Sequence, residues 1–209
     1  DACLGRDIIN FAFNQHLLAS EVEKLMPDGR VKTLDLSWSA ITDESDTILR
    51  LMLCVRDVTE LRKLAAEADV LIENFRPGTM EKWGLSYEAL SAINPKLIML
   101  RVSGYGQTGP KRDEPGFAAI AEAMAGLRYL TGEPGRPPAR AGLSLGDTIA
   151  GLHGALGVLL ALYERDARGG KGQVIDVALY ESVFNLTESL LPEYSVFGAI
   201  RHPAGGALP

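Results

Sequence analysis

The chain of 209 residues is 46% hydrophobic and 23% charged, which is typical of globular protein and suits one domain, or one domain with an appendage. Its formal net charge of -6 disfavours a nucleic-acid-binding surface, because phosphate recognition needs clustered lysines and arginines. Its two cysteines, Cys3 and Cys54, form no C-x-x-C pair, so we expect neither a bound metal nor a disulfide framework.

The low cysteine content fits a reducing, cytoplasmic setting. No uninterrupted apolar run reaches the roughly 18–20 residues of a membrane span, so we expect no membrane association. The chain begins at Asp1 without a methionine or a leader peptide, and it ends in a glycine-containing stretch, 205–209. We therefore interpret it as an internal fragment.

Residues 1–67 are polar and acidic, with short apolar patches. Their patterns predict strands over 31–38 and 51–55 and a helix over 57–67. The stretch 51–62 resembles the closing strand and exit helix of a PAS-type sensor module. The sequence therefore predicts a small α+β segment here, either sensor-like or a non-native appendage.

Residues 68–209 show the alternating strand and helix patterns of an α/β protein. Short apolar strands are predicted over 69–73, 97–102 and 173–177, and helices over 83–93, 117–127, 147–168 and 178–190. Strands that alternate with helices imply crossover connections. We therefore predict a mostly parallel, Rossmann-like sheet with flanking helices.

The run from Gly104 to Gly109 satisfies G-x-G-x-x-G directly after a predicted strand. A dinucleotide site needs a helix to begin at the third glycine, and the following residues, 110–116, are too rich in Pro and Gly for one. This pattern instead favours a loop whose backbone N–H groups could wrap another phosphate beside Lys111 and Arg112, or a plain surface loop.

The run 142–146 matches the G-x-S-x-G nucleophile elbow, with Ser144 at its centre. A helix follows, but no strand precedes it, and the elbow requires both. Asp176 and His202 come in the chain order of a hydrolase triad. A serine hydrolase is therefore a weaker alternative.

Asp147 stands at the start of the predicted helix over 147–168. Asp is a favoured helix N-cap, which alone would explain its presence. The helix is apolar around almost its whole circumference, so we expect it to be buried on nearly every side. A carboxylate that heads such a helix would be shielded from water and kept ionised by the helix dipole, as a carboxylate nucleophile requires.

These segments together resemble the family III CoA-transferases, which include formyl-CoA and carnitine CoA-transferases and the α-methylacyl-CoA racemases. The matching text runs over residues 68–78, 84–87, 94–95, 104–110, 116–117, 124–126, 131–132, 146–147 and 168–179. The resemblance covers about residues 68–209, an incomplete large domain of that family. Its motifs are numerous and keep the family's order.

The resemblance implies that Asp147 is the residue that carries the acyl group. It places the CoA site at Asn74, Phe75 and Arg76 and at the neighbouring loop, with Gly104, Tyr105, Gly106 and Lys111. The substrates would be an acyl-CoA and a small carboxylic acid, with CoA as a substrate and no tightly bound cofactor. Complete members of the family form interlocked homodimers.

Racemases of the family use a histidine before the Ala-rich helix, where this chain has Phe117 after Gly116. The transferase interpretation is therefore favoured over the racemase alternative. Ala118 and Ala119 stand where some formyl-CoA transferases carry an acidic residue, which argues against that substrate. The remaining alternatives are a sensor module fused to an inactive fragment and a fusion that arose in cloning.

Overall fold

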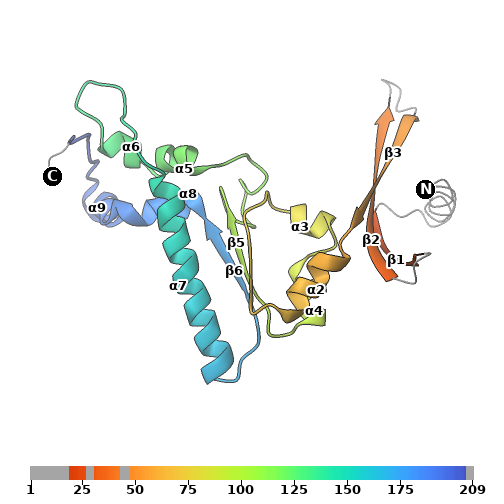
Figure 1. Ribbon diagram of the computed structural model, residues 1–209. Helices are drawn as coiled ribbons and strands as arrows, with labels where there is room; N and C mark the ends of the chain where they lie inside the picture. Colours follow the sequence, from red (N-terminus) through yellow and green to blue (C-terminus); the bar gives the residue numbers. More distant parts are fainter. Residues whose placement is uncertain (1–18, 27–30, 43–47, 206–209) are drawn as a thin grey trace.

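The computed structural model describes residues 19–26, 31–42 and 48–205. Within these ranges the chain forms an antiparallel and a parallel sheet of three strands each (Figure 1). The antiparallel sheet projects to one side, beyond α2, and the parallel sheet lies between two groups of helices.

The antiparallel sheet has the order β1-β2-β3, with β1 (Ala19–Leu25), β2 (Val31–Thr42) and β3 (Ile48–Asp57). The two strands predicted in this region are thus confirmed, and both are longer than the sequence indicated. Two hydrogen bonds join β2 to the start of α2 (Thr59–Glu67). Val58 N donates to Thr33 O at 3.0 Å, and Thr33 N donates to Thr59 Oγ1 at 2.8 Å.

The parallel sheet has the order β4-β5-β6, with β4 (Val70–Glu73), β5 (Ile98–Ser103) and β6 (Val174–Ala178). Both neighbouring pairs are parallel, which confirms the predicted α/β class. The carboxyl ends of the three strands therefore meet at one edge, where open α/β sheets bind their ligands.

Helices cover both faces of this sheet, so a separate apolar core lies on each side. On one face, α2, α3 (Thr79–Lys82) and α4 (Tyr87–Ile93) enclose Val58, Ala65, Met80, Leu85, Leu90, Leu97 and Met99. On the other, α5 (Ala118–Met124), α7 (Leu145–Ala167) and α8 (Leu179–Phe184) enclose Leu100, Ala121, Ala125, Ala150, Val177, Leu179 and Val183. Since α2 contributes to the first core, residues before 68 stabilise the α/β unit. The division at residue 67 stays a prediction.

Several predicted helices are shorter than expected because glycines interrupt them. Gly84, with φ of 63°, separates α3 from α4. Ser86 is the N-cap of α4, since its Oγ accepts from Ala89 N at 3.2 Å. Gly126, with φ of 84°, separates α5 from α6 (Leu127–Leu130). The helix predicted over 178–190 is also shorter, since α8 ends at Phe184. A 3₁₀ turn (Asn185–Thr187) and α9 (Leu190–Phe197) follow it.

Helix α7 contacts the sheet through a stripe of small residues that includes Gly154 and Gly157. A Cβ at Gly154 would lie 2.9 Å from the Leu100 side chain, so any larger residue would force that side chain to shift. The opposite face is exposed and carries Leu152, Leu156, Leu159 and Leu160, at 57–70%. The expectation that this helix is buried on nearly every side is therefore wrong.

Among the described residues, α7 is the helix long and apolar enough to cross a membrane by length and composition, with a mean hydropathy of 1.5. Glycines and His153 interrupt its apolar run, so the uninterrupted runs are shorter than a membrane span. Core helices of soluble proteins can have the same length and composition.

Candidate active site

A cavity of about 310 Å³ lies at the carboxyl edge of the parallel sheet. Each strand contributes to it through the residues at or just after its end. Its wall includes Asn74, Phe75 and Arg76 after β4, Ser103 and Gly104 from β5, Leu179 after β6, and Asp147 from α7. Five of the predicted site residues are thus brought to one cavity from three separate segments of the chain.

Asp147 is the third residue of α7, so it lies within the first turn and is not the N-cap, a position that Ser144 occupies. Its neighbour Gly146 is buried, and a Cβ there would lie 3.2 Å from Ala118. This close packing fixes the helix start against α5. Asp147 itself is exposed, so the expectation of a shielded carboxylate is wrong for this structure.

The turn that carries Asn74, Phe75 and Arg76 is fixed by a buried ion pair. Glu73 Oε1 accepts from Arg101 Nε at 2.6 Å, and Glu73 Oε2 accepts from the backbone N–H of Phe75 at 2.7 Å. The two side chains are 2% and 8% exposed, so water competes little for either group. One carboxylate thus ties the end of β4, the adjacent strand β5 and the cavity-lining turn together.

Arg101 also reaches α3 through Glu81. Arg101 donates two hydrogen bonds to the Glu81 carboxylate, at 2.6 and 3.2 Å. The hydrogen bond from Arg101 lowers the pKa of Glu81 below its ordinary value. This bidentate pairing gives the guanidinium a second partner on the more exposed side.

The loop from Gly104 to Gly116 leaves the sheet edge and returns to it at nearly the same point. A Cβ on Gly104 would lie 2.5 Å from Gly116 Cα, so the two backbones cross in contact. Within the loop, Gln107 N donates to the Asp176 carboxylate at 2.8 Å. The loop is therefore anchored at its base and to β6. No helix begins at Gly109, and α5 begins only at Ala118, as expected for a loop that is not a dinucleotide fingerprint.

The remaining predicted residues, Tyr105, Gly106 and Lys111, line a different cavity of about 180 Å³. Their neighbours there include Asp176, Tyr180 and Glu181. Lys111 pairs with Glu114 at 2.9 Å, and this hydrogen bond raises the pKa of Lys111. The structure therefore divides the predicted CoA-binding set between two cavities.

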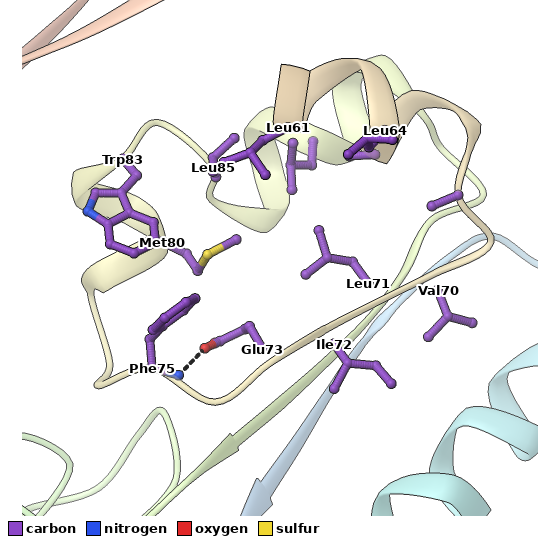
Figure 2. A pocket seen from close by; sticks show the side chains of 13 residues that line it. Leu61, Leu64, Val70, Leu71, Ile72, Glu73, Phe75, Met80, Trp83 and Leu85 are labelled. Carbon is purple, nitrogen blue, oxygen red and sulfur yellow. Dashed lines mark hydrogen bonds between the residues drawn. The ribbon is translucent and has the colours of Figure 1, made fainter. Parts of the chain in front are cut away.

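A third cavity, of about 350 Å³, lies on the other side of Phe75 and is almost entirely apolar (Figure 2). Leu61 and Leu64 of α2, Ile72 of β4, and Met80 and Trp83 at α3 surround it. The one ionisable group in its wall is Glu73, whose carboxylate is already occupied by Arg101 and Phe75 N. This cavity offers apolar contact and no reactive group.

The fully buried Glu122 of α5 anchors the segment that leads to Asp147. Its Oε2 lies 3.7 Å from Arg128 Nε and 3.7 Å from Arg140 Nε, the latter in the loop before α7. Neither carboxylate oxygen has a hydrogen-bond partner among the described residues. Glu122 therefore interacts with the two arginines through charge alone, without a hydrogen bond.

Two members of the weaker hydrolase alternative have partners outside the proposed triad. Asp176 accepts from Gln107 N, and His202 Nδ1 lies 3.4 Å from Tyr129 Oη. Within the described ranges, no group of His, Cys, Asp and Glu side chains could hold a metal ion.

The sequence did not indicate Ser103, and it indicated Arg112 only as a cation beside a possible phosphate-binding loop, although both residues line the cavity of Asp147. Ser103 Oγ is buried and has no hydrogen-bond partner among the described residues. Ser103 ends an apolar strand and Arg112 lies in an irregular loop, so neither has a local signature. The one available signal for Ser103 was its position at the end of a predicted parallel strand, because such strand ends meet at the ligand-binding edge of the sheet.

Comparisons with known proteins identify the family of the chain. The model of CoA-transferase family III matches residues 56–209. The chain is 45% identical over 201 residues to the succinyl-CoA–D-citramalate CoA-transferase of Chloroflexus aurantiacus, covering 91% of this chain and 50% of that enzyme. It is 57% identical over 144 residues to the α subunit of the succinyl-CoA–L-malate CoA-transferase of the same organism, covering 68% of this chain and 33% of that subunit.

Among solved structures, a CAIB/BAIF family protein from Brucella suis matches with a TM-score of 0.65 and 40% identity. That match covers 68% of this chain and 38% of the Brucella protein. The chain spans about half the length of the citramalate enzyme, and its alignment with that enzyme extends into residues before 56. The chain belongs to CoA-transferase family III.

Proposed function

We propose that the protein transfers CoA from an acyl-CoA to a carboxylic acid, with Asp147 as the residue that carries the acyl group. The observation that supports this most directly is the shared cavity. Asp147 reaches it from the first turn of a long helix, and Asn74 and Arg76 reach it from the end of β4. A nucleophile and a substrate-binding turn from distant segments thus meet where α/β sheets bind ligands.

The proposed reaction passes through two mixed anhydrides and one aspartyl-CoA thioester. The Asp147 carboxylate attacks the thioester carbonyl, the C–S bond breaks, and a mixed anhydride and the CoA thiolate form. The thiolate then attacks the aspartyl carbonyl, which gives an aspartyl-CoA thioester and releases the first acid. The acceptor carboxylate attacks this thioester to form a second anhydride, and the returning thiolate takes the new acyl group and regenerates Asp147.

Asn74, Phe75, Arg76 and Gly104 are proposed to bind the thioester end of CoA. Tyr105, Gly106 and Lys111 are proposed to bind a more distant part in the adjoining cavity. Because Lys111 is paired with Glu114, a phosphate there would have to displace that carboxylate. We expect no tightly bound cofactor and a homodimer in the complete protein, and we place it in the cytoplasm.

The two curated relatives described above are named for succinyl-CoA with citramalate or malate as acceptor. We therefore propose small dicarboxylic acids as the substrate class. Both names favour transferase over racemase chemistry. The resemblance of residues 1–67 to a sensor module stays a prediction, since the family model begins at residue 56.

Exposure of Asp147 has a chemical consequence. A mixed anhydride in contact with water would hydrolyse, so the bound substrate or another part of the protein must cover it during transfer. Without such cover the enzyme would act partly as a thioesterase.

An exchange assay tests the proposal. Succinyl-CoA is incubated with isotopically labelled succinate and the protein, and the label in the thioester is followed. Transfer through Asp147 moves label into succinyl-CoA, and Asp147→Asn abolishes this exchange. Equal exchange by wild type and variant would rule out Asp147 as the carrier.

A further inference from the structure

Arg112 is a cation placed beside the candidate nucleophile without a strong partner. It lines the cavity of Asp147 and also an adjoining cavity of about 330 Å³ that Arg101 and Gln107 line. Its ion pair with Asp113 is long, at 3.5 Å, and the two side chains are 55% and 82% exposed. Such a pair contributes little, so the guanidinium is available to a ligand.

The other charged groups in the Asp147 cavity leave Arg112 free for this role. Glu114 also lines the cavity, but Lys111 holds its carboxylate at 2.9 Å. Arg112 and Asp147 both line this cavity, so one ligand that fills it could contact both.

The chemistry of CoA makes a guanidinium at this position informative. The phosphates of CoA lie at the opposite end of the pantetheine arm from the sulfur, and the thioester end is uncharged. A cation that lines the cavity of the nucleophile can therefore pair with a carboxylate of the acyl group or of the acceptor acid.

The backbone of the loop that carries Arg112 is anchored at several points. Its ends cross at Gly104 and Gly116, and its middle is tied to Asp176 through Gln107 N. Within it, Glu114 N donates to Lys111 O at 2.9 Å, which closes a turn around Arg112. A guanidinium on such a backbone is suited to bidentate binding of a carboxylate.

We propose that Arg112 binds the second carboxylate of a dicarboxylic acyl group and so selects dicarboxylic over monocarboxylic substrates. This inference rests on the proposed function, because it takes Asp147 as the site of reaction. Arg76, on the turn after β4, has no ion-pair partner among the described residues and is assigned to CoA. Substitution at these two arginines should therefore have different effects.

The test measures binding in the Asp147→Asn background, where the ester is not consumed. The ligands are succinyl-CoA, butyryl-CoA, which has the same acyl chain length without the second carboxylate, and free CoA. Each is titrated by calorimetry into Asp147→Asn alone and combined with Arg112→Gln, Arg112→Lys or Arg76→Gln. Circular dichroism checks that each variant is folded, which the exposure of both arginines favours.

Succinyl-CoA should bind about ten-fold more tightly than butyryl-CoA, the effect of one charge-assisted contact. Arg112→Gln should reduce this ratio to about one, and Arg112→Lys should leave part of it, since lysine keeps the charge without the fork. Arg76→Gln should weaken all three ligands and preserve the ratio. A succinyl-CoA preference over butyryl-CoA that is absent in Asp147→Asn alone, or that survives Arg112→Gln, overturns the proposal. If free CoA and both esters fail to bind, the proposed function itself has failed.

Discussion

Substitution of Glu73 by Gln tests whether one buried ion pair holds the substrate-binding turn. The change keeps the size and shape of the side chain and removes its charge. Glu73 currently accepts from Arg101 Nε at 2.6 Å with one oxygen and from Phe75 N at 2.7 Å with the other. Glutamine has only one acceptor oxygen, so its NH₂ group must face one of these two donors.

The expected loss follows from the burial of the pair. Removal of one partner of a buried ion pair costs about 3–5 kcal/mol, because the other charge remains without compensation. Arg101 keeps its contacts to Glu81, which places the expected loss at the low end, about 3 kcal/mol. The displaced turn carries Phe75 and Arg76, so affinity for CoA should also fall.

Urea unfolding, followed by circular dichroism, measures the free energy of unfolding at an unchanged m-value. Glu81→Gln is the matched control: Glu81 is 40% exposed, so its loss should cost at most about 1 kcal/mol. A loss below about 1 kcal/mol for Glu73→Gln would refute the reasoning.

Glu122→Gln provides a contrast at a second buried glutamate. The Glu122 carboxylate is fully buried and its oxygens accept no hydrogen bond from the described residues, while two arginine Nε atoms lie 3.7 Å away. Removal of a charge so poorly satisfied should be neutral or stabilising. A loss as large as that of Glu73→Gln would mean that burial alone, and not hydrogen bonding, sets the cost.

Other features give comparably direct predictions. Gly151→Ala should stabilise α7 by about 0.5–1 kcal/mol, since no atom lies within 4 Å of the added Cβ. Gly154→Ala should destabilise α7 by about 1–3 kcal/mol, because its Cβ would press on the Leu100 side chain. Thermal melts that give the two variants the same stability would contradict this. The hydrogen bond from Arg201 lowers the pKa of Glu193 to about 2, so its contribution to stability is complete above pH 4.5 and is lost as pH falls toward 2. NMR titration should place the Glu193 carboxyl near pH 2 in the wild type and nearer its ordinary value in Arg201→Gln, and identical titrations would contradict the contact.

The parallel sheet was predictable because its strands are short, continuously apolar and separated by helix patterns. The ends of the helices were less predictable than the strands. A glycine at positive φ, such as Gly84 or Gly126, interrupts a helix without any change in the hydrophobic pattern. Exposure of the leucines of α7 was not predictable at all. Hydrophobic composition indicates that a helix has apolar faces, but only the packed structure shows which of them is covered.

For the site, the juxtaposition of Asp147 with Asn74 and Arg76 followed from the family resemblance and from the common edge of parallel strand ends. The separate cavity of Lys111 depends on how a glycine-rich loop folds back, which no local pattern encodes. Arg101 was absent from the predicted site because its role comes from partners 20 and 28 residues away in the chain.

Trapping of the acyl group on Asp147 tests the central assignment most directly. The chain is incubated with succinyl-CoA and hydroxylamine, digested, and mapped by mass spectrometry, with Asp147→Asn as control. An aspartyl hydroxamate at position 147, and at no other acidic residue, is the predicted result. A hydroxamate at a different carboxylate, or none at 147 when CoA is released, would contradict it.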